Sequence, residues 1–269
     1  MRRRTIHDRH LDWTRQDIEQ RFFPGAGGRY TRVNGLLSGL FGILLAVGFY
    51  GMLSTTSLAA TQFGQVFLDR GPTQHAVVVL FFWSLVILLV KLSKLRLQRR
   101  ALDIRLLPEE PGFVISTATV EQVLQRLREI TDDPRYFMVL NRVEVALSNL
   151  RNLGRVGDVE DILRSQASQD ESQMETSYAL IQGFVWAIPV LGFIGTVLGL
   201  SQAIGSFTAV LGTGQEVSAI TGALGKVTAG LATAFDTTLV ALVAALIIQI
   251  LMVMTKKSEE EFLDEAMEH

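Results

Sequence analysis

One segment constrains the fold of this chain more than any other, because it combines a proline, three glycines and a threonine within an uncharged region. It reads Pro189-Val190-Leu191-Gly192-Phe193-Ile194-Gly195-Thr196-Val197-Leu198-Gly199, and no charged residue occurs from Thr176 to Gln215. Such a run is typical of a membrane-spanning helix. Glycines three and four residues apart leave a flat helix face that a neighbouring backbone can approach closely. We therefore predict a helix that packs through Pro189, Gly192, Gly195 and Gly199, with the Thr196 hydroxyl facing a partner helix or a wet path.

The composition favours a membrane protein and excludes several functional classes. Hydrophobic residues make up 48% of the chain, and a net charge of -2 provides no basic surface for nucleic acid. Cysteine is absent, which excludes disulfides and thiolate metal sites, and the four histidines are scattered. We therefore expect contact with a lipid bilayer, no nucleic-acid partner, no metal site and no catalytic residues, so the protein is not expected to be an enzyme.

Four hydrophobic blocks are long enough to cross a bilayer. They lie at about 36–54, 76–90, 178–211 and 227–255, and a helix needs roughly 20 apolar residues to span the hydrocarbon core. The third and fourth blocks exceed that length, so both helices are expected to extend beyond the membrane. Gly212-Thr213-Gly214 favours a turn between them. The predicted fold class is an all-α integral membrane protein with four transmembrane helices and a helical cytoplasmic domain.

The distribution of basic residues sets the predicted orientation. Eight arginines precede the first block, whereas the next loop holds only Arg70 and five basic residues follow the second block. This bias predicts that both termini and the region 96–177 are cytoplasmic. No apolar core directly follows the basic start at Arg2-Arg3-Arg4, so we expect no cleavable signal peptide.

These features divide the chain into five predicted segments. They are a cytoplasmic amphipathic segment (1–34), the first two spans (35–95), a helical cytoplasmic domain (96–177), the last two spans (178–255) and a cytoplasmic tail (256–269). In the cytoplasmic domain, Thr119 and Gln122 predict a capping box before one helix, and Asp132-Asp133-Pro134 ends that helix. A second helix is expected from 135 to about 152. A third is expected to begin at Asp158 and to continue unbroken into the third span.

Residues 2–23 have the pattern of a short amphipathic helix. Leu11, Ile18 and Phe22 fall on one side of it, with arginines opposite. A helix lying on anionic headgroups is the first interpretation, and docking against a partner is the second.

The fourth block contains an acidic residue within a membrane helix. Asp236 is the only charged residue between Lys226 and Lys256. A charge near the bilayer centre costs roughly 2.5–3.5 kcal/mol on insertion scales, so such residues usually face a bundle interior or a water-filled cavity. At about 100° per residue, Thr233, Asp236, Thr237 and Val240 share one face, whereas Thr238 points elsewhere.

We therefore predict an ion pathway lined by Thr196, Thr233, Asp236 and Thr237. The alternative for each threonine is a hydrogen bond to a carbonyl of its own helix. The alternatives for Asp236 are a structural hydrogen bond or a neutral, protonated side chain.

At these residues the chain resembles the MotA/TolQ/ExbB proton channel family. The segment from Pro189 to Gly199 is similar to that family's pattern Pro-x-x-Gly-x-x-Gly-Thr-Val-x-Gly, and Leu231-Ala232-Thr233-Ala234 is similar to the Leu-Ala-Thr-Ala of its final helix. The resemblance covers roughly Gln173 to Met254, and upstream only the architecture agrees.

The resemblance implies a bacterial inner-membrane protein that forms a homo-oligomer, a pentamer, around two copies of a single-pass ExbD/TolR/MotB-like partner. That partner carries a membrane aspartate, and the complex converts the proton or sodium motive force into mechanical work. By motif position, Thr196 and Thr233 match the hydroxyls that face the partner helices. No cofactor is implied beyond the transported H⁺ or Na⁺.

The chain departs from the family pattern at three positions of the fourth block. Thr228 stands where TolQ and ExbB commonly carry a glutamate, Leu242 where they carry a proline, and Asp236 where a small residue is usual. The number of spans, four, is closer to that of MotA, whereas the motif sequences are closer to those of TolQ and ExbB. Two other functions stay open: a membrane scaffold or signalling receptor acting through the cytoplasmic helices, and a secondary transporter, although we find no inverted repeat.

Overall fold

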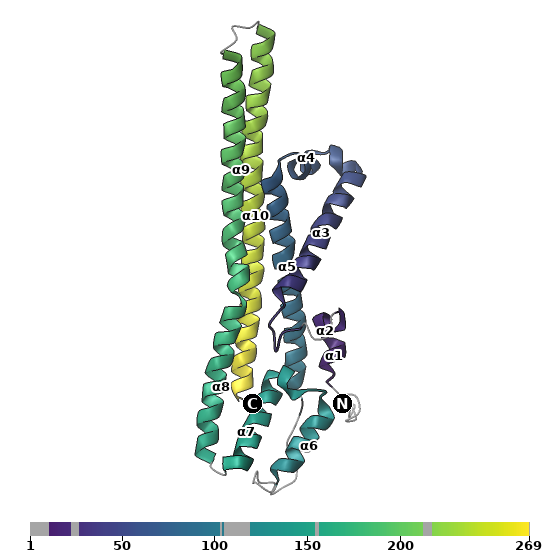
Figure 1. Cartoon of the computed structure of the whole chain (residues 1–269), viewed down its shortest axis with the longest axis vertical. Coiled ribbons are helices and arrows are strands. Elements are labelled where there is room, and N and C mark those ends of the chain that lie inside the picture. Colours follow the sequence, from purple (N-terminus) through teal and green to yellow (C-terminus); the bar gives the residue numbers. More distant parts are fainter. Residues whose placement is uncertain are drawn as a thin grey trace. The chain divides into compact units, whose positions relative to one another are not determined.

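The computed structural model describes residues 11–22, 27–102, 104, 119–153, 156–211 and 217–268, and helices are the only regular secondary structure in these ranges (Figure 1). An isolated parallel bridge joins Leu11 to Thr131. The all-α prediction is confirmed. In chain order the helices are α1 (Trp13–Gln16), α2 (Ile18–Phe22), α3 (Gly35–Thr55), the 3₁₀ helix η2 (Ser57–Ala60), α4 (Gln62–Leu68), α5 (Pro72–Leu102), α6 (Val120–Ile130), the 3₁₀ helix η3 (Pro134–Tyr136), α7 (Met138–Leu153), α8 (Val156–Ser177), α9 (Ala179–Leu211) and α10 (Val217–Glu268).

Within the part of the chain that the structure describes, four helical stretches are long and apolar enough to cross a membrane, as predicted. α3 agrees with the first predicted block within one residue at each end. α5 has 31 residues and is longer than its block, because the basic stretch after Val90 continues the helix. α10 has 52 residues. At about 1.5 Å per residue it is roughly 78 Å long, more than twice the ~30 Å hydrocarbon core. The predicted turn at 212–214 lies outside the described residues.

The expectation of an unbroken helix from Asp158 into the third span is wrong at one residue. α8 ends at Ser177 and α9 begins at Ala179, with Tyr178 in a turn between them. The Tyr178 N–H donates to the Glu175 carbonyl at 3.1 Å, and this three-residue spacing tightens the end of α8.

The chain forms two compact units, and α5 and α10 contribute residues to both. The unit that we call the membrane unit comprises 36–87 and 180–253, and the head unit comprises 1–35, 88–179 and 254–269.

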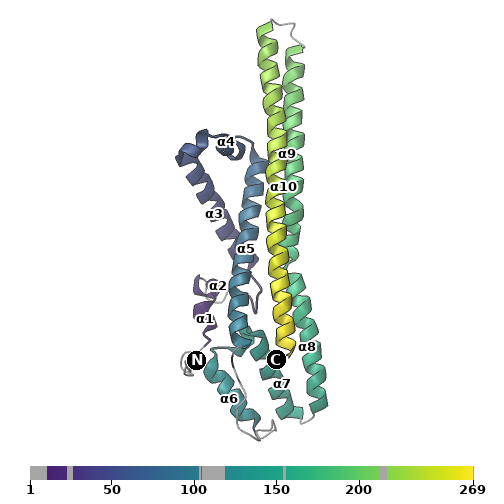
Figure 2. The ribbon, with the colours of Figure 1, turned by 180° about the vertical axis from the view of Figure 1, so that it is seen from behind.

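In the membrane unit α3 packs on α5, and α9 and α10 lie side by side in both views (Figures 1 and 2). Trp83 of α5 makes the contact with α3: a Cβ placed at Gly42 would lie 2.6 Å from the Trp83 Cα, and the Trp83 indole N–H donates to the Ser38 hydroxyl at 3.2 Å. A buried apolar cluster then joins α5 to α9 and α10; it consists of Val77, Ile188, Ala241, Ala244 and Ala245.

In the head unit α6 packs on α7 through one apolar face. Its buried members are Val120, Val123, Leu124 and Leu147, which agrees with the amphipathic spacing of both segments. The predicted capping box is wrong: Thr119 is the N-cap of α6, but its side chain makes no capping hydrogen bond. The Thr119 backbone is helical (φ −93°, ψ −15°), whereas an N-cap residue that bonds to the helix normally has an extended backbone.

The predicted single helix over 2–23 is also wrong within the described residues. Residues 13–22 form two short helices, α1 and α2, which are interrupted at Asp17. Leu11 and Trp13 are buried in a cluster with residues of α5, α6 and α7, whereas Ile18 is 42% exposed. The other members of this cluster are Leu97, Ala101, Ile104, Leu127, Phe137 and Leu140. Leu11 and Trp13 therefore pack against other parts of the head unit, whereas Ile18 does not.

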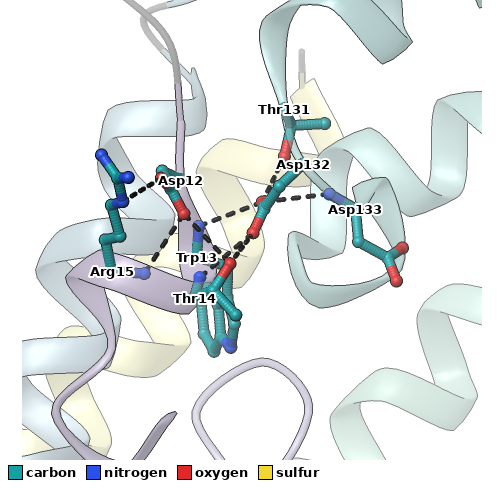
Figure 3. A network of polar contacts seen from close by, with 7 residues as sticks. All are labelled: Asp12, Trp13, Thr14, Arg15, Thr131, Asp132 and Asp133. Carbon is teal, nitrogen blue, oxygen red and sulfur yellow. Dashed lines mark hydrogen bonds and ion pairs between the residues drawn. The ribbon is translucent and has the colours of Figure 1, made fainter. Parts of the chain in front are cut away.

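Asp132 fastens the start of α1 to the loop after α6 (Figure 3). Its carboxylate accepts hydrogen bonds from the Trp13 N–H at 3.0 Å, the Thr14 N–H at 3.1 Å and the Thr14 hydroxyl at 2.6 Å. Burial alone would raise the pKa of Asp132, but these hydrogen bonds outweigh it and lower the pKa below 3.8. The Asp132 carboxyl is therefore ionised when it binds residues Trp13 and Thr14.

Candidate functional site

The glycines of the proline-glycine segment stand where α9 meets α10. A Cβ at Gly192 would lie 2.5 Å from the Ala241 Cβ, and one at Gly199 would lie 2.7 Å from the Gly230 carbonyl oxygen. A Cβ at Gly195 would lie 2.7 Å from the Thr237 hydroxyl. Pro189 lies inside α9, directly after the buried Ile188. Side chains at these glycines would hold the two backbones apart.

Two threonines form reciprocal hydrogen bonds across this contact. The Thr196 hydroxyl of α9 donates to the Ala234 carbonyl of α10 at 2.9 Å, and the Thr238 hydroxyl of α10 donates to the Gly192 carbonyl of α9 at 3.1 Å. The two hydroxyls also contact each other. As predicted, Thr238 points away from the Thr233 face of α10. It contacts Thr196 of α9.

Thr233 and Thr237 bond along their own helix. The Thr233 hydroxyl donates to the Ala229 carbonyl at 3.0 Å, and the Thr237 hydroxyl donates to the Thr233 carbonyl at 2.9 Å. Thr237 is buried against Gly195, while Thr233 is half-buried. Within the described residues, Thr196 and Thr233 share no hydrogen bond, so the predicted pathway residues form two groups.

Asp236 is paired with an arginine. An Arg70 guanidinium nitrogen lies 2.7 Å from an Asp236 carboxylate oxygen, and another donates to the Thr233 hydroxyl at 3.2 Å. The side chains of Arg70 and Asp236 are 19% and 28% exposed. Gly71, which has a positive φ of 86°, and Pro72 at the start of α5 turn the chain directly after Arg70. Arg70, Asp236 and Thr233 thus form a partly open polar group within the membrane unit.

Arg70 was missed as a site residue by the sequence analysis. A usable signal existed: Arg70 is the only base in the loop between the first two spans, and Asp236 is the only acid in the fourth. Two isolated opposite charges in apolar surroundings stabilise each other by pairing. Gln74, one turn into α5, is also buried, and its amide finds no hydrogen-bond partner among the described residues.

Large apolar side chains remain exposed along α9 and α10. Phe193 and Ile204 of α9 are 65% and 66% exposed, and Phe235 of α10 is 67% exposed. In a membrane such surfaces meet lipid tails or other helices. The α9–α10 pair therefore has apolar surface available for both.

Comparison with known proteins agrees with this architecture. Residues 139–268, which include α8, α9 and α10, match the model of the MotA/TolQ/ExbB proton channel family. The match begins well upstream of Gln173, so the likeness extends into α7 and α8, which lie before the two motifs. No curated protein and no solved structure matches the chain significantly. The family expected from the two motifs is therefore the one whose model residues 139–268 match, the MotA/TolQ/ExbB proton channel family.

Proposed function

We propose that the chain is the channel-forming stator subunit of an ion-driven motor. In this proposal a pentamer encloses two copies of a single-pass ExbD/TolR/MotB-like partner, and protons or sodium ions pass between them. The match to this family supports proton conduction as the general activity. The observation that carries the proposal is the polar group formed by Arg70, Asp236 and Thr233 within the membrane unit, because intramembrane charges usually mark ion pathways.

The two polar groups have different roles in the proposed pathway. Thr233 and Asp236 are only partly buried in one subunit, so they are available to the partner helices. Asp236 supplies a fixed negative charge to the ring, and Arg70 limits its attraction for cations. Thr196 bonds across to α10, and it fixes the pathway wall while its second lone pair accepts a hydrogen bond from the partner side.

The work that one ion can supply sets a requirement for the complex. One charge moving through 100 mV releases about 2.3 kcal/mol. A machine that does larger work must therefore couple many ions to repeated movement, which requires a partner that binds and releases each ion.

The proposal is tested on the full complex purified from its native membrane. Native mass spectrometry should give five copies of this chain with two of a small single-pass protein. After reconstitution into liposomes, a potassium-valinomycin potential should drive proton uptake, which a trapped pH dye reports; sodium uptake is measured in parallel.

Valine variants separate pathway hydroxyls from structural ones. Thr196→Val and Thr233→Val should each lower ion flux at least ten-fold with normal assembly. Thr208→Val is the matched control, because the Thr208 hydroxyl is exposed and bonds only to the Ile204 carbonyl of its own helix; its flux should match that of the wild type. Full flux in all three variants would contradict the pathway. If the complex assembles and conducts no ions but co-purifies with a soluble protein, the result would favour a scaffold or receptor function.

A further inference from the structure

The head unit buries five ionisable side chains in one cluster. Lys91 and Lys94 of α5 are each 1% exposed, and Glu259 of α10 is 3% exposed. Asp17 and Glu19 of the N-terminal segment are 2% and 6% exposed. Buried charges are stable only when each has an opposite charge and hydrogen bonds.

Glu259 is fully paired. Its carboxylate lies 3.1 Å from the Lys91 ammonium and accepts a hydrogen bond from the Tyr178 hydroxyl at 2.6 Å. The Thr31 hydroxyl donates to it as well. Lys91 also lies over the Tyr178 ring, 4.1 Å from its centroid. Lys91 and Glu259 thus neutralise each other.

Lys94 directs its hydrogen bonds away from Asp17. Its ammonium donates to Glu19 at 2.5 Å, to the Arg32 carbonyl at 2.9 Å and to the Gly28 carbonyl at 3.4 Å. An ammonium has three N–H donors, so these acceptors use all of them. Glu19 accepts a further hydrogen bond from the Asn34 N–H at 2.8 Å.

Asp17 is the least well-satisfied carboxyl group of the cluster: the Lys94 ammonium and the Glu19 N–H act on it, but neither meets hydrogen-bond geometry. It lies 3.5 Å from the Lys94 ammonium, and neither of its carboxylate oxygens has a hydrogen-bond partner in the described residues. The cluster holds three carboxyl groups, Asp17, Glu19 and Glu259, and two ammonium groups. With all five ionised, one negative charge would be buried unpaired, and a proton on Asp17 removes it.

We propose that Asp17 is a proton-binding site that controls how firmly α1 and α2 dock on α5. Protonated Asp17 fits the cluster, and ionised Asp17 places an uncompensated charge beside Glu19. The charged groups that face Asp17 are Lys94 of α5 and Glu19 of α2, with the Lys91–Glu259 pair behind Lys94. This device stands apart from ion conduction, and it makes the head unit responsive to pH on its side of the membrane.

The direction of the pH effect follows from burial. Desolvation raises the pKa of Asp17 above its ordinary 3.8, the Glu19 charge adds to this, and Lys94 opposes it. A carboxyl with a raised pKa binds its proton more tightly when docked than when released. Docking is therefore strongest at low pH and weakens as pH rises from 3.8 through the raised pKa, by up to ten-fold in the docking equilibrium per pH unit.

Hydrogen exchange of the full chain in lipid nanodiscs tests the proposal. Exchange of the backbone amides of residues 11–22, corrected for the intrinsic pH dependence, should speed up as pH rises from 3.8 and should level off above the raised pKa of Asp17. Asp17→Asn keeps the shape without the charge, so its exchange at pH 8 should be at least ten-fold slower than wild type and nearly independent of pH. Asp17→Ser should show the same loss of pH dependence.

Glu19→Gln is the matched control, because Glu19 is the carboxylate that Lys94 binds directly. This variant should exchange faster than wild type at low pH, where Asp17 is protonated and Lys94 would have no ionised carboxylate beside it. If Asp17→Asn instead exchanged faster than wild type, as Glu19→Gln does, Asp17 would be an ionised partner of Lys94 and the proposal would be overturned. Unchanged pH dependence in both Asp17 variants would overturn it equally.

Discussion

Replacing Gly192 with alanine tests the close contact between α9 and α10. The new Cβ would lie 2.5 Å from the Ala241 Cβ and 3.3 Å from the Thr237 carbonyl oxygen, whereas apolar carbons are in contact at about 3.5–4.0 Å. The two helices must therefore move apart by about 1 Å at this level. Overpacking of this kind costs roughly 1–3 kcal/mol, and the better helix propensity of alanine offsets up to about 1 kcal/mol. We expect a net loss of about 1–2 kcal/mol.

The assay is reversible unfolding of the purified protein in detergent. Gly183→Ala is the matched control in the same helix, because a Cβ at Gly183 meets nothing within 4 Å; this variant should be as stable as the wild type or slightly more stable. Ala241→Gly removes the methyl group on the opposite helix. Combined with Gly192→Ala, it transfers one methyl group from α10 to α9 and leaves the contact intact.

The double variant decides the interpretation. It should be more stable than the sum of the single changes predicts, with a coupling of about 1 kcal/mol or more, because residues in direct contact are not additive. Additive effects, or a Gly192→Ala variant as stable as Gly183→Ala, would refute the idea that the α9–α10 distance is set by these two positions.

Two further predictions concern charged groups. Arg70→Gln and Asp236→Asn should each destabilise the fold by less than the ~3–5 kcal/mol of a fully buried pair, since both side chains are partly exposed; the double variant should recover most of the loss, and a double variant whose loss, measured by unfolding, equals the sum of the two single losses would contradict pairing. Asp132→Ala removes the acceptor of Trp13 and Thr14, so amide exchange should rise at residues 11–16. Because the pKa of Asp132 is lowered, its contribution is present above pH 3.8 and is lost as pH falls through the lowered pKa; protection in the wild type that never falls to the level of Asp132→Ala as the pH is lowered below 3.8 would contradict it.

The membrane helices were predictable because one physical rule governs them. A charge-free apolar run has no favourable place except the bilayer, so the ends of α3 and α9 were predicted within one residue. Helix-breaking residues also act locally. As expected, α6 ends directly before the Asp132-Asp133-Pro134 segment. The positions of Gly192, Gly195 and Gly199, three and four residues apart, also predicted that this face of α9 would pack closely against another helix.

Contacts between distant segments were not predictable in the same way. An amphipathic pattern in residues 2–23 indicates an apolar face but does not say what covers it, since headgroups and neighbouring helices both satisfy it. Leu11 and Trp13 in fact pack against the head unit. The pairing of Arg70 with Asp236 depends on how α5 packs beside α10, which no single-helix pattern contains. Thr238 was set aside because its direction was judged against α10 alone.

The reciprocal hydrogen bonds of Thr196 and Thr238 have a mechanical consequence. One bond runs from α9 to α10 and the other from α10 to α9. Sliding either helix by a single residue, about 1.5 Å, or turning it by one position would break both at once and leave hydroxyls and carbonyls unpaired in an apolar medium. The facing parts of α9 and α10 are therefore held in one register, and in the proposed motor a working stroke would have to take place at their outer surfaces.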